Sequence, residues 1–254
     1  MIERFGKQRD FFLARALDDA RKWCVPPESY VDTKKHSDQY WLRLFSSASE
    51  PVTDRDAHDF LISFQLETRF TKWNEVALAK RINTFRGQEI ADLPAEIGVL
   101  AEELRGFLKS GKGLQTSGAS KIAFFAKPRC DVYIWDQHAR RSARFRDWRR
   151  ASGGSNPRQF SSPYVAHGVH DYASFKGSCD VALKEELMRH DFNGAVERFR
   201  SYVRRVGGPM ADNKLLRDSS FIERRFLDKL MFWEGKYVEG LKASLKPPER
   251  SAAD

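Results

Sequence analysis

Apolar residues recur with the spacing of an α-helix along most of this 254-residue chain. The clearest example is a stripe that follows the i, i+3, i+4 pattern of one buried helix face: Ile97, Leu100, Ala101, Leu104, Phe107 and Leu108. No two neighbouring segments alternate apolar and polar residues as paired strands do, and strands do not alternate with helices as in βαβ units. The pattern therefore predicts an all-α fold.

Capping residues and prolines divide the helical pattern into segments. Thr53 with Asp56 resembles a capping box, Ser220 with Glu223 forms a full one, and Pro94 suits the first turn of a helix. The stretch 132–135 is a compact extended run between two helices. The predicted helices cover residues 8–24, 40–45, 53–66, 72–86, 94–108, 119–126, 136–150, 171–190, 193–206 and 219–234.

The organisation of the chain points to a single unit. We expect one bilobal domain over residues 1–254, with a cleft between two helical lobes. The Ser/Gly/Asn/Pro-rich stretch 151–163 reads as an exposed loop, and the polar tail 247–254 is predicted to be disordered.

An excess of basic residues narrows the choice of partner. Lysine and arginine together number 44 against 35 acids, which gives a formal net charge of +9. Basic domains often bind polyanions, of which nucleic acid is the commonest. No apolar run approaches the roughly 20 residues of a membrane span, and the N-terminal residues do not resemble a secretory signal. Three scattered cysteines without a CxxC pair indicate reduced thiols, so we expect a cytoplasmic protein that contacts no membrane.

The most informative segment is 116–144. Small residues precede Lys121, and small residues let a backbone approach a phosphate closely. Asp136 stands at the start of the next helix, where the helix dipole keeps a carboxylate ionised. A helix and an extended return of about 12 Å each separate the two residues, so both can reach one cleft. The alternative is a surface lysine and an aspartate that serves only as a cap.

This segment resembles the helix-hairpin-helix DNA glycosylase superfamily, in particular 8-oxoguanine glycosylase-like bacterial members of uncertain substrate. The match covers small residues, Ser-Lys, a hydrophobic helix, a proline, a hydrophobic-Trp-Asp stretch and an Ala/Arg helix within 116–144, and the helix 225–235 resembles the closing helix of such members. The resemblance implies that 110–150 holds the hairpin and catalytic segment. It also implies that Lys121 can attack C1′ of a flipped nucleotide, and that Asp136 stabilises the sugar cation. No iron–sulfur cysteine array follows, so no cofactor is expected.

Residues that would bind DNA surround this pair. The run from 137 to 160 holds seven arginines and one acid. Arginine forms bidentate hydrogen bonds with phosphates, although a run of charged residues often marks only a solvent-exposed helix face. The predicted DNA-binding residues are Ser117, Gly118, Ser120, Arg140, Arg141 and Arg144. Candidates to stack on or read an extruded base are Trp135, Gln137, His138, Phe124, Trp41 and Trp73, although each aromatic ring is also a natural core residue.

Two further readings remain open. The first is the mechanism: Lys121 is the nucleophile if the enzyme is bifunctional, with abasic-lyase activity, and otherwise it positions a phosphate or water. The second is the function itself. We predict a DNA N-glycosylase that excises a damaged or modified base, in repair or in antiviral defence, with DNA as its partner and no obligate protein partner. The alternatives are a non-catalytic nucleic-acid-binding module on the same scaffold and a protein-interaction protein with incidental basicity. Although His167, His170 and Asp171 have ligand-type spacing, no metal site is predicted.

Overall fold

A computed structural model of the chain describes residues 5–24, 36–47, 49–67, 72–108, 115–152 and 171–243. Within these ranges the regular elements are all helices, and the one strand-like pairing is a bridge between Trp73 and Leu108. The predicted all-α class is therefore confirmed. The helices are α2 (Arg9–Cys24), α3 (Asp38–Ser46), α4 (Asp54–Ser63), α5 (Glu75–Gly87), α6 (Leu93–Gly106), α7 (Thr116–Ala126), α8 (Gln137–Ser152), α11 (Tyr172–Leu187), α12 (His190–Val206), the 3₁₀ turn η1 (Pro209–Ala211), α13 (Asn213–Asp218) and α14 (Phe221–Ala243).

Three predicted features lie outside the described residues. They are the loop 151–163 from residue 153 onward, the tail 247–254, and the part of the hairpin segment between residues 109 and 114. The histidines 167 and 170 are outside as well.

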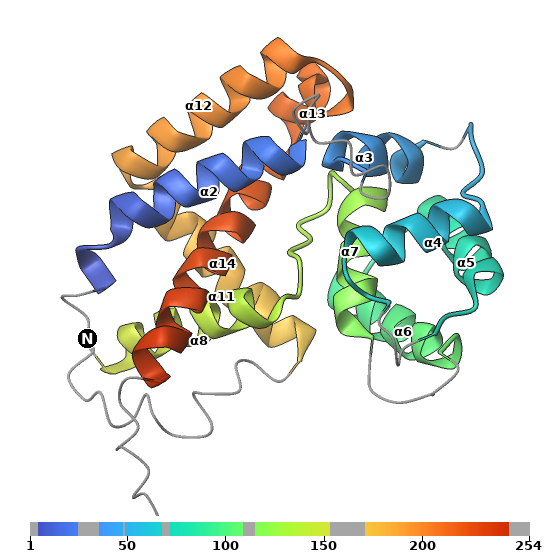
Figure 1. Cartoon of the computed structure of the whole chain (residues 1–254), viewed down its shortest axis with the longest axis horizontal. Coiled ribbons are helices and arrows are strands. Elements are labelled where there is room, and N and C mark those ends of the chain that lie inside the picture. Colours follow the sequence, from blue (N-terminus) through green and yellow to red (C-terminus); the bar gives the residue numbers. More distant parts are fainter. Residues whose placement is uncertain are drawn as a thin grey trace, which may run out of the picture.

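The helices form two groups (Figure 1). In one group α2 packs along α12 and α14, and α14 packs along α8. In the other group α6 packs on α7, and α4 packs on α5. The extended segment 127–136, which joins α7 to α8, passes between the two groups (Figure 1). This connection carries the chain from one group of helices to the other.

The helical stripes predicted from the sequence form the core. Ile97, Leu100, Ala101 and Leu104 on α6 are fully buried. Burial of such apolar faces is the main source of helix stability in a globular protein. The prediction that these stripes are core residues is therefore confirmed.

Buried charged side chains tie distant helices together. Arg225 on α14 pairs with Asp38 at the start of α3, with an Nε–Oδ2 distance of 2.6 Å, and both side chains are almost fully buried. Arg146 on α8 binds Glu186 and Glu234 in the same way. Removing one partner of such a pair leaves an uncompensated buried charge. These contacts fix how α8, α11 and α14 meet.

The capping predictions have mixed outcomes. At α4, Thr53 and Asp56 form the expected capping box. At α14 the capping box is wrong, because Glu223 pairs with Arg200 and the Ser220 hydroxyl accepts a hydrogen bond from Arg224 Nε at 3.0 Å. Here an ion pair and a hydrogen bond to an arginine side chain take the place of the local cap.

Candidate functional site

Lys121 and Asp136 line one cavity of about 250 Å³. Residues of α2 and α14 line it from one group of helices, and the end of α4 and α7 line it from the other. Ile134, in the segment between the groups, completes this wall. The structure thus brings together the two residues that the sequence pairs at a distance of fifteen positions.

Two sets of hydrogen bonds position Asp136. The Trp135 backbone N–H donates to Ser120 Oγ at 2.9 Å, so the extended segment runs back along α7. Arg224, buried in α14, donates to the Val132 carbonyl oxygen at 2.9 Å and holds the same segment from the other side. Asp136 then begins α8, where its Oδ1 accepts the backbone N–H of His138 at 2.7 Å. The predicted role of Asp136 as a helix cap is confirmed.

Lys121 is a buried amine with an unusual titration. Its Nζ donates to Ser117 Oγ at 2.5 Å. The predicted helix 119–126 would place Lys121 in its first turn, but α7 begins at Thr116, so Lys121 lies in the second turn. Burial lowers the pKa of Lys121 to about 8, against the opposing attraction of Asp136 and Asp228. A lysine whose pKa lies near neutrality has a substantial fraction of free amine, which is the nucleophilic form.

Asp228 and Lys229 of α14 line the same cavity, and neither was predicted from the sequence. Burial raises the pKa of Asp228, and burial together with the charge of Arg225 lowers the pKa of Lys229. Arg225 Nη1 donates to Asp228 Oδ2 at 2.7 Å. The available signal was three charges at i, i+3 and i+4 that share one face of the helix with apolar neighbours such as Phe221 and Phe232.

Two aromatic rings that face each other also line the cavity. Trp23 at the end of α2 and Phe64 at the end of α4 are half-buried, and their planes differ by only 16° with ring centroids 6.3 Å apart. Near-parallel aromatic rings at the wall of one cavity offer faces on which a planar group can stack.

Gln65, beside Phe64 in the cavity wall, has a backbone φ of 54°. It is the one non-glycine residue with positive φ among the described residues. This left-handed conformation costs about 1 kcal/mol or more for a residue with a Cβ. Strain of this kind concentrates at functional sites.

The small residues before Lys121 do not form a separate turn, because they lie inside α7. Gly118 is buried, and a Cβ at this position would lie 3.5 Å from Leu104 Cδ1 of α6. Ser120 is fully buried and holds Trp135. The expectation of a phosphate-binding turn over these residues is therefore corrected: small side chains here allow α7 to pack closely on α6. Only Ser117 keeps part of its surface exposed.

The three predicted DNA-binding arginines lie half-buried on α8. The Arg140 guanidinium lies over the Trp135 ring, 4.3 Å from its centroid. Arg141 Nη1 is 3.0 Å from Glu239 Oε2, and Arg144 is partly exposed on the same helix. Partly exposed arginines can turn towards a phosphate at small cost.

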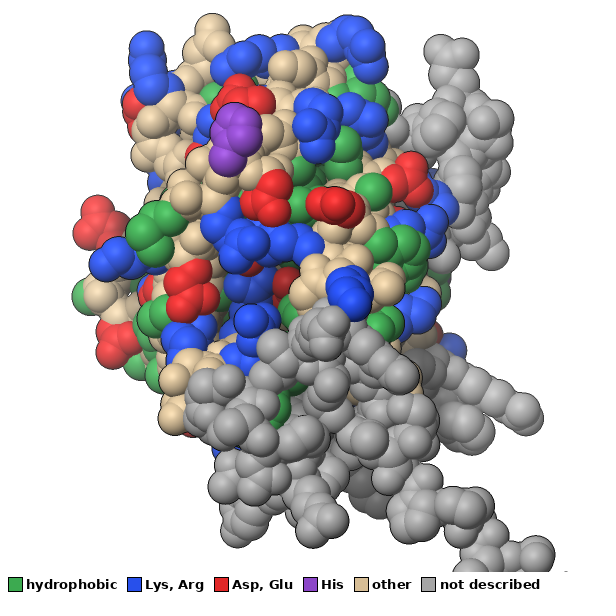
Figure 2. Space-filling view, turned by 90° about the vertical axis from the view of Figure 1, so that its left-hand side faces the viewer, with side chains coloured by type: hydrophobic (Ala, Val, Ile, Leu, Met, Phe, Trp, Pro, Cys, Tyr) green, Lys and Arg blue, Asp and Glu red, His purple; other side chains and the backbone are tan. Residues whose placement is uncertain are grey.

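A second concentration of basic side chains lies where α2 begins and α8 ends. Figure 2 shows lysine and arginine side chains gathered in the middle of this face, with acidic side chains around them. Arg9, Arg146, Arg149, Arg150 and Arg189 line a cavity of about 440 Å³ there. Arg9, Arg146 and Arg150 are held by acidic partners, so Arg146 and Arg150 of the arginine run have a largely structural role.

The six residues predicted to contact a flipped base do not line the cavity. Trp41, Trp73 and Phe124 are core residues, with at most 3% of their surface exposed. Of the other three, Trp135 packs on Phe175, Gln137 is exposed, and His138 is 3.6 Å from Glu239 and packs against Phe232 of the cavity wall. A core ring cannot stack on an extruded base, and the cavity presents Trp23 and Phe64 in their place.

No family model, no curated protein and no solved structure matches this chain. Among the helices that the structure describes, none has the length and apolar character needed to cross a bilayer. Functional interpretation therefore depends on the geometry and chemistry of the cavity.

Proposed function

We propose that this protein is a DNA N-glycosylase, which cleaves the bond between a damaged or modified base and its sugar and leaves an abasic site. One observation carries the proposal. A buried lysine with a lowered pKa and a helix-capping carboxylate line the same cavity as two parallel aromatic rings. An amine, a carboxylate and a planar slot are the groups that such a reaction needs.

The cavity residues divide the work of the reaction. Trp23 and Phe64 hold the extruded base between their faces, as enzymes that act on bases must take them out of the helix. The Asp136 carboxylate stabilises the positive charge that develops on the sugar. Lys121 Nζ forms a bond to C1′ while the base leaves with the electron pair of the N-glycosidic bond. One proton of the new ammonium passes to the departing base, and the C1′–O4′ bond opens as O4′ takes a proton from water, which gives a Schiff base. Water then hydrolyses the Schiff base to the abasic site and the free amine of Lys121.

The size of the cavity and the arginines on α8 are compatible with a DNA substrate. The cavity is smaller than the roughly 300–1,000 Å³ of a drug-sized pocket, so it suits a single base. In the proposal the two groups of helices are the two lobes of the glycosylase, and the cavity is the cleft between them. The pair α6–α7 acts as the helix-hairpin-helix element, and the exposed parts of Arg140, Arg141 and Arg144 contact phosphates.

A panel of duplexes, each with one damaged or modified base, tests the proposal. The chain is incubated with each duplex, and abasic sites are detected by their cleavage in alkali. Release of at least one base, dependent on Asp136, supports a glycosylase. DNA binding without abasic product across the panel would instead support the non-catalytic binding module.

Lys121 is expected to form a covalent adduct with DNA that borohydride traps. Because the pKa of Lys121 is about 8, the rate of trapping should rise between pH 6 and pH 9 as the amine loses its proton. Lys121→Ala should abolish the adduct. The matched control is Lys229→Met, which removes the other lysine of the same cavity. An adduct that survives in Lys121→Ala, or that Lys229→Met alone abolishes, would contradict the assignment.

Binding to undamaged duplex DNA should weaken steeply with salt. Each phosphate contact contributes a slope of about −0.9 to log K against log salt. The double variant Arg140→Ala/Arg144→Ala should make that slope less negative by about two, whereas Arg217→Ala on α13 should leave the slope unchanged. Fluorescence anisotropy between 50 and 200 mM salt measures the slope. A flat plot for the unmodified chain would remove the electrostatic premise.

A further inference from the structure

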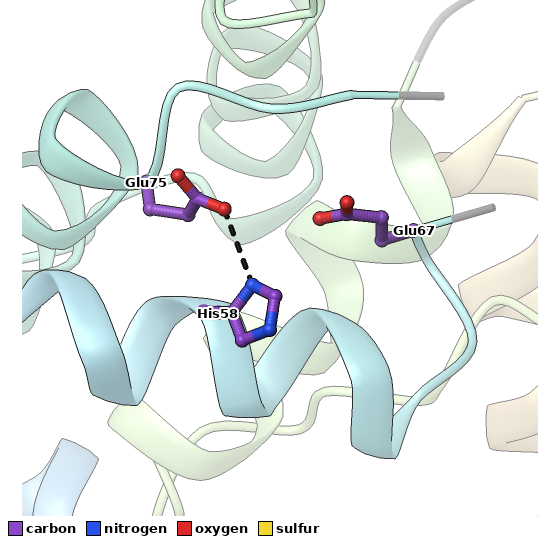
Figure 3. Close-up of side chains that lie close together, drawn as sticks. All are labelled: His58, Glu67 and Glu75. Atoms are coloured by element: carbon purple, nitrogen blue, oxygen red, sulfur yellow. Dashed lines mark hydrogen bonds and ion pairs between the residues drawn. The ribbon is translucent and has the colours of Figure 1, made fainter. Parts of the chain in front are cut away.

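Three potential metal ligands meet away from the cavity of Lys121 and Asp136. His58 lies on α4, Glu75 begins α5, and Glu67 lies in the segment between these helices. One ligand atom of each residue lies within 4.8 Å of the other two. Figure 3 shows the Glu67 carboxylate facing His58 and Glu75 across a short gap. His58 Nδ1 is 3.2 Å from Glu75 Oε1.

The environment of Glu67 is a second and independent observation. Its side chain is only 7% exposed, and its Oε2 is buried without a hydrogen-bond partner among the described residues. A buried carboxylate oxygen without a partner is costly, because it loses water and gains nothing in exchange. Its Oε1 accepts a hydrogen bond from Lys72 Nζ at 2.7 Å, but the Lys72 side chain is 57% exposed and can leave.

We propose that His58, Glu67 and Glu75 bind a divalent transition-metal ion, with Zn²⁺ as the best fit. An imidazole nitrogen with two carboxylates suits zinc, whereas magnesium and calcium prefer oxygen ligands alone. Tetrahedral zinc holds ligand atoms about 3.3 Å apart at bond lengths of about 2.0 Å, with water in the fourth position. The His58 and Glu75 side chains are 48% and 36% exposed, so both can turn towards the fixed Glu67 carboxylate.

Metal binding would act on the cavity wall from outside. The ion would join α4 to α5 across the segment that follows Phe64 and Gln65, both of which line the cavity. The site therefore clamps the strained residue Gln65 and the ring of Phe64 in place. This inference does not depend on the proposed glycosylase activity, because it rests on separate residues.

Calorimetric titration of the metal-stripped chain with ZnCl₂ tests the proposal. We expect one ion per chain and, at a hundredfold excess over Kd, a rise in Tm of about 5–10 °C. His58→Ala and Glu75→Gln should each weaken binding at least tenfold. His190→Ala, at the exposed start of α12, is the matched control, and it should bind like the unmodified chain.

Three further measurements make the test decisive. Lys72→Gln removes the cation that competes for Glu67, so Zn²⁺ should bind more tightly than to the unmodified chain. Co²⁺ should give the visible absorption of a four-coordinate site, and this absorption should be lost in His58→Ala. The double variant His167→Ala/His170→Ala should retain binding. The proposal is overturned by absent binding, or by binding that survives in His58→Ala and is lost in that double variant.

Discussion

Replacing Asp136 with asparagine is expected to slow base release by about 10²–10³-fold while the fold persists. The amide side chain that the substitution introduces retains an oxygen that can accept the backbone N–H groups of His138 and Ala139, which Asp136 accepts at 2.7 and 3.2 Å. Asparagine caps helices about as well as aspartate does. What the substitution removes is the negative charge that, in the proposed mechanism, faces the sugar. DNA affinity should hold or rise, since one charge that repels phosphates is gone.

Single-turnover base release and the melting temperature measure this result together. The matched control is Asp92→Asn, which neutralises another capping aspartate, at α6, where Oδ1 accepts the Ala95 N–H at 3.1 Å. Both variants should melt within a few degrees of the unmodified chain, and only Asp136→Asn should lose activity. Release near the unmodified rate by a well-folded Asp136→Asn variant would remove Asp136 from the active site.

Replacing Gly235 with alanine is expected to destabilise the protein by about 3 kcal/mol or more, at the upper end of overpacking effects. Gly235 lies where α14 crosses the start of α8, and a Cβ there would lie 1.9 Å from the His138 carbonyl oxygen. Backbone atoms cannot move aside as a flexible side chain can, so the two helices must separate. The start of α8 carries Asp136, so base release should fall as well.

Thermal and urea unfolding measure the loss, which corresponds to a Tm lowered by about 6–12 °C. The control is Gly240→Ala, five residues along α14, where nothing lies within 4 Å of an added Cβ. Alanine favours a helix over glycine by about 1 kcal/mol, so this variant should be as stable as the unmodified chain or slightly more so. If Gly235→Ala melted like Gly240→Ala, the close approach of α14 to α8 would be wrong.

Features that depend on consecutive residues could be predicted from the sequence. The all-α class, the buried stripe of α6, the capping box of Thr53 and Asp56 and the cap of Asp136 all follow from spacing and local hydrogen bonds. The approach of Lys121 to Asp136 belongs to the same group. It follows from the lengths of one helix and one extended return, and Arg224 of α14 then holds the return in place.

Local patterns misled where one residue type serves two purposes. The small residues Gly118 and Ser120 suit a phosphate-binding turn and tight helix packing equally, and the contacts of Leu104 and Trp135 decide for packing. Ser220 with Glu223 has the spacing of a capping box, but Arg200, from another helix, takes the Glu223 carboxylate.

Only the tertiary structure decided which side chains share the cavity. Trp23, Phe64 and Asp228 come from α2, α4 and α14, which are far apart in the chain. Helical spacing shows that a residue lies on one face, but not which distant helix that face meets. That choice depends on how whole helices pack and on buried pairs such as Arg225 with Asp38, which join segments separated by most of the chain. The sequence by itself therefore determined the helices and the placement of Lys121 near Asp136, and packing alone determined that Trp23, Phe64, Asp228 and Lys229 line the cavity around them.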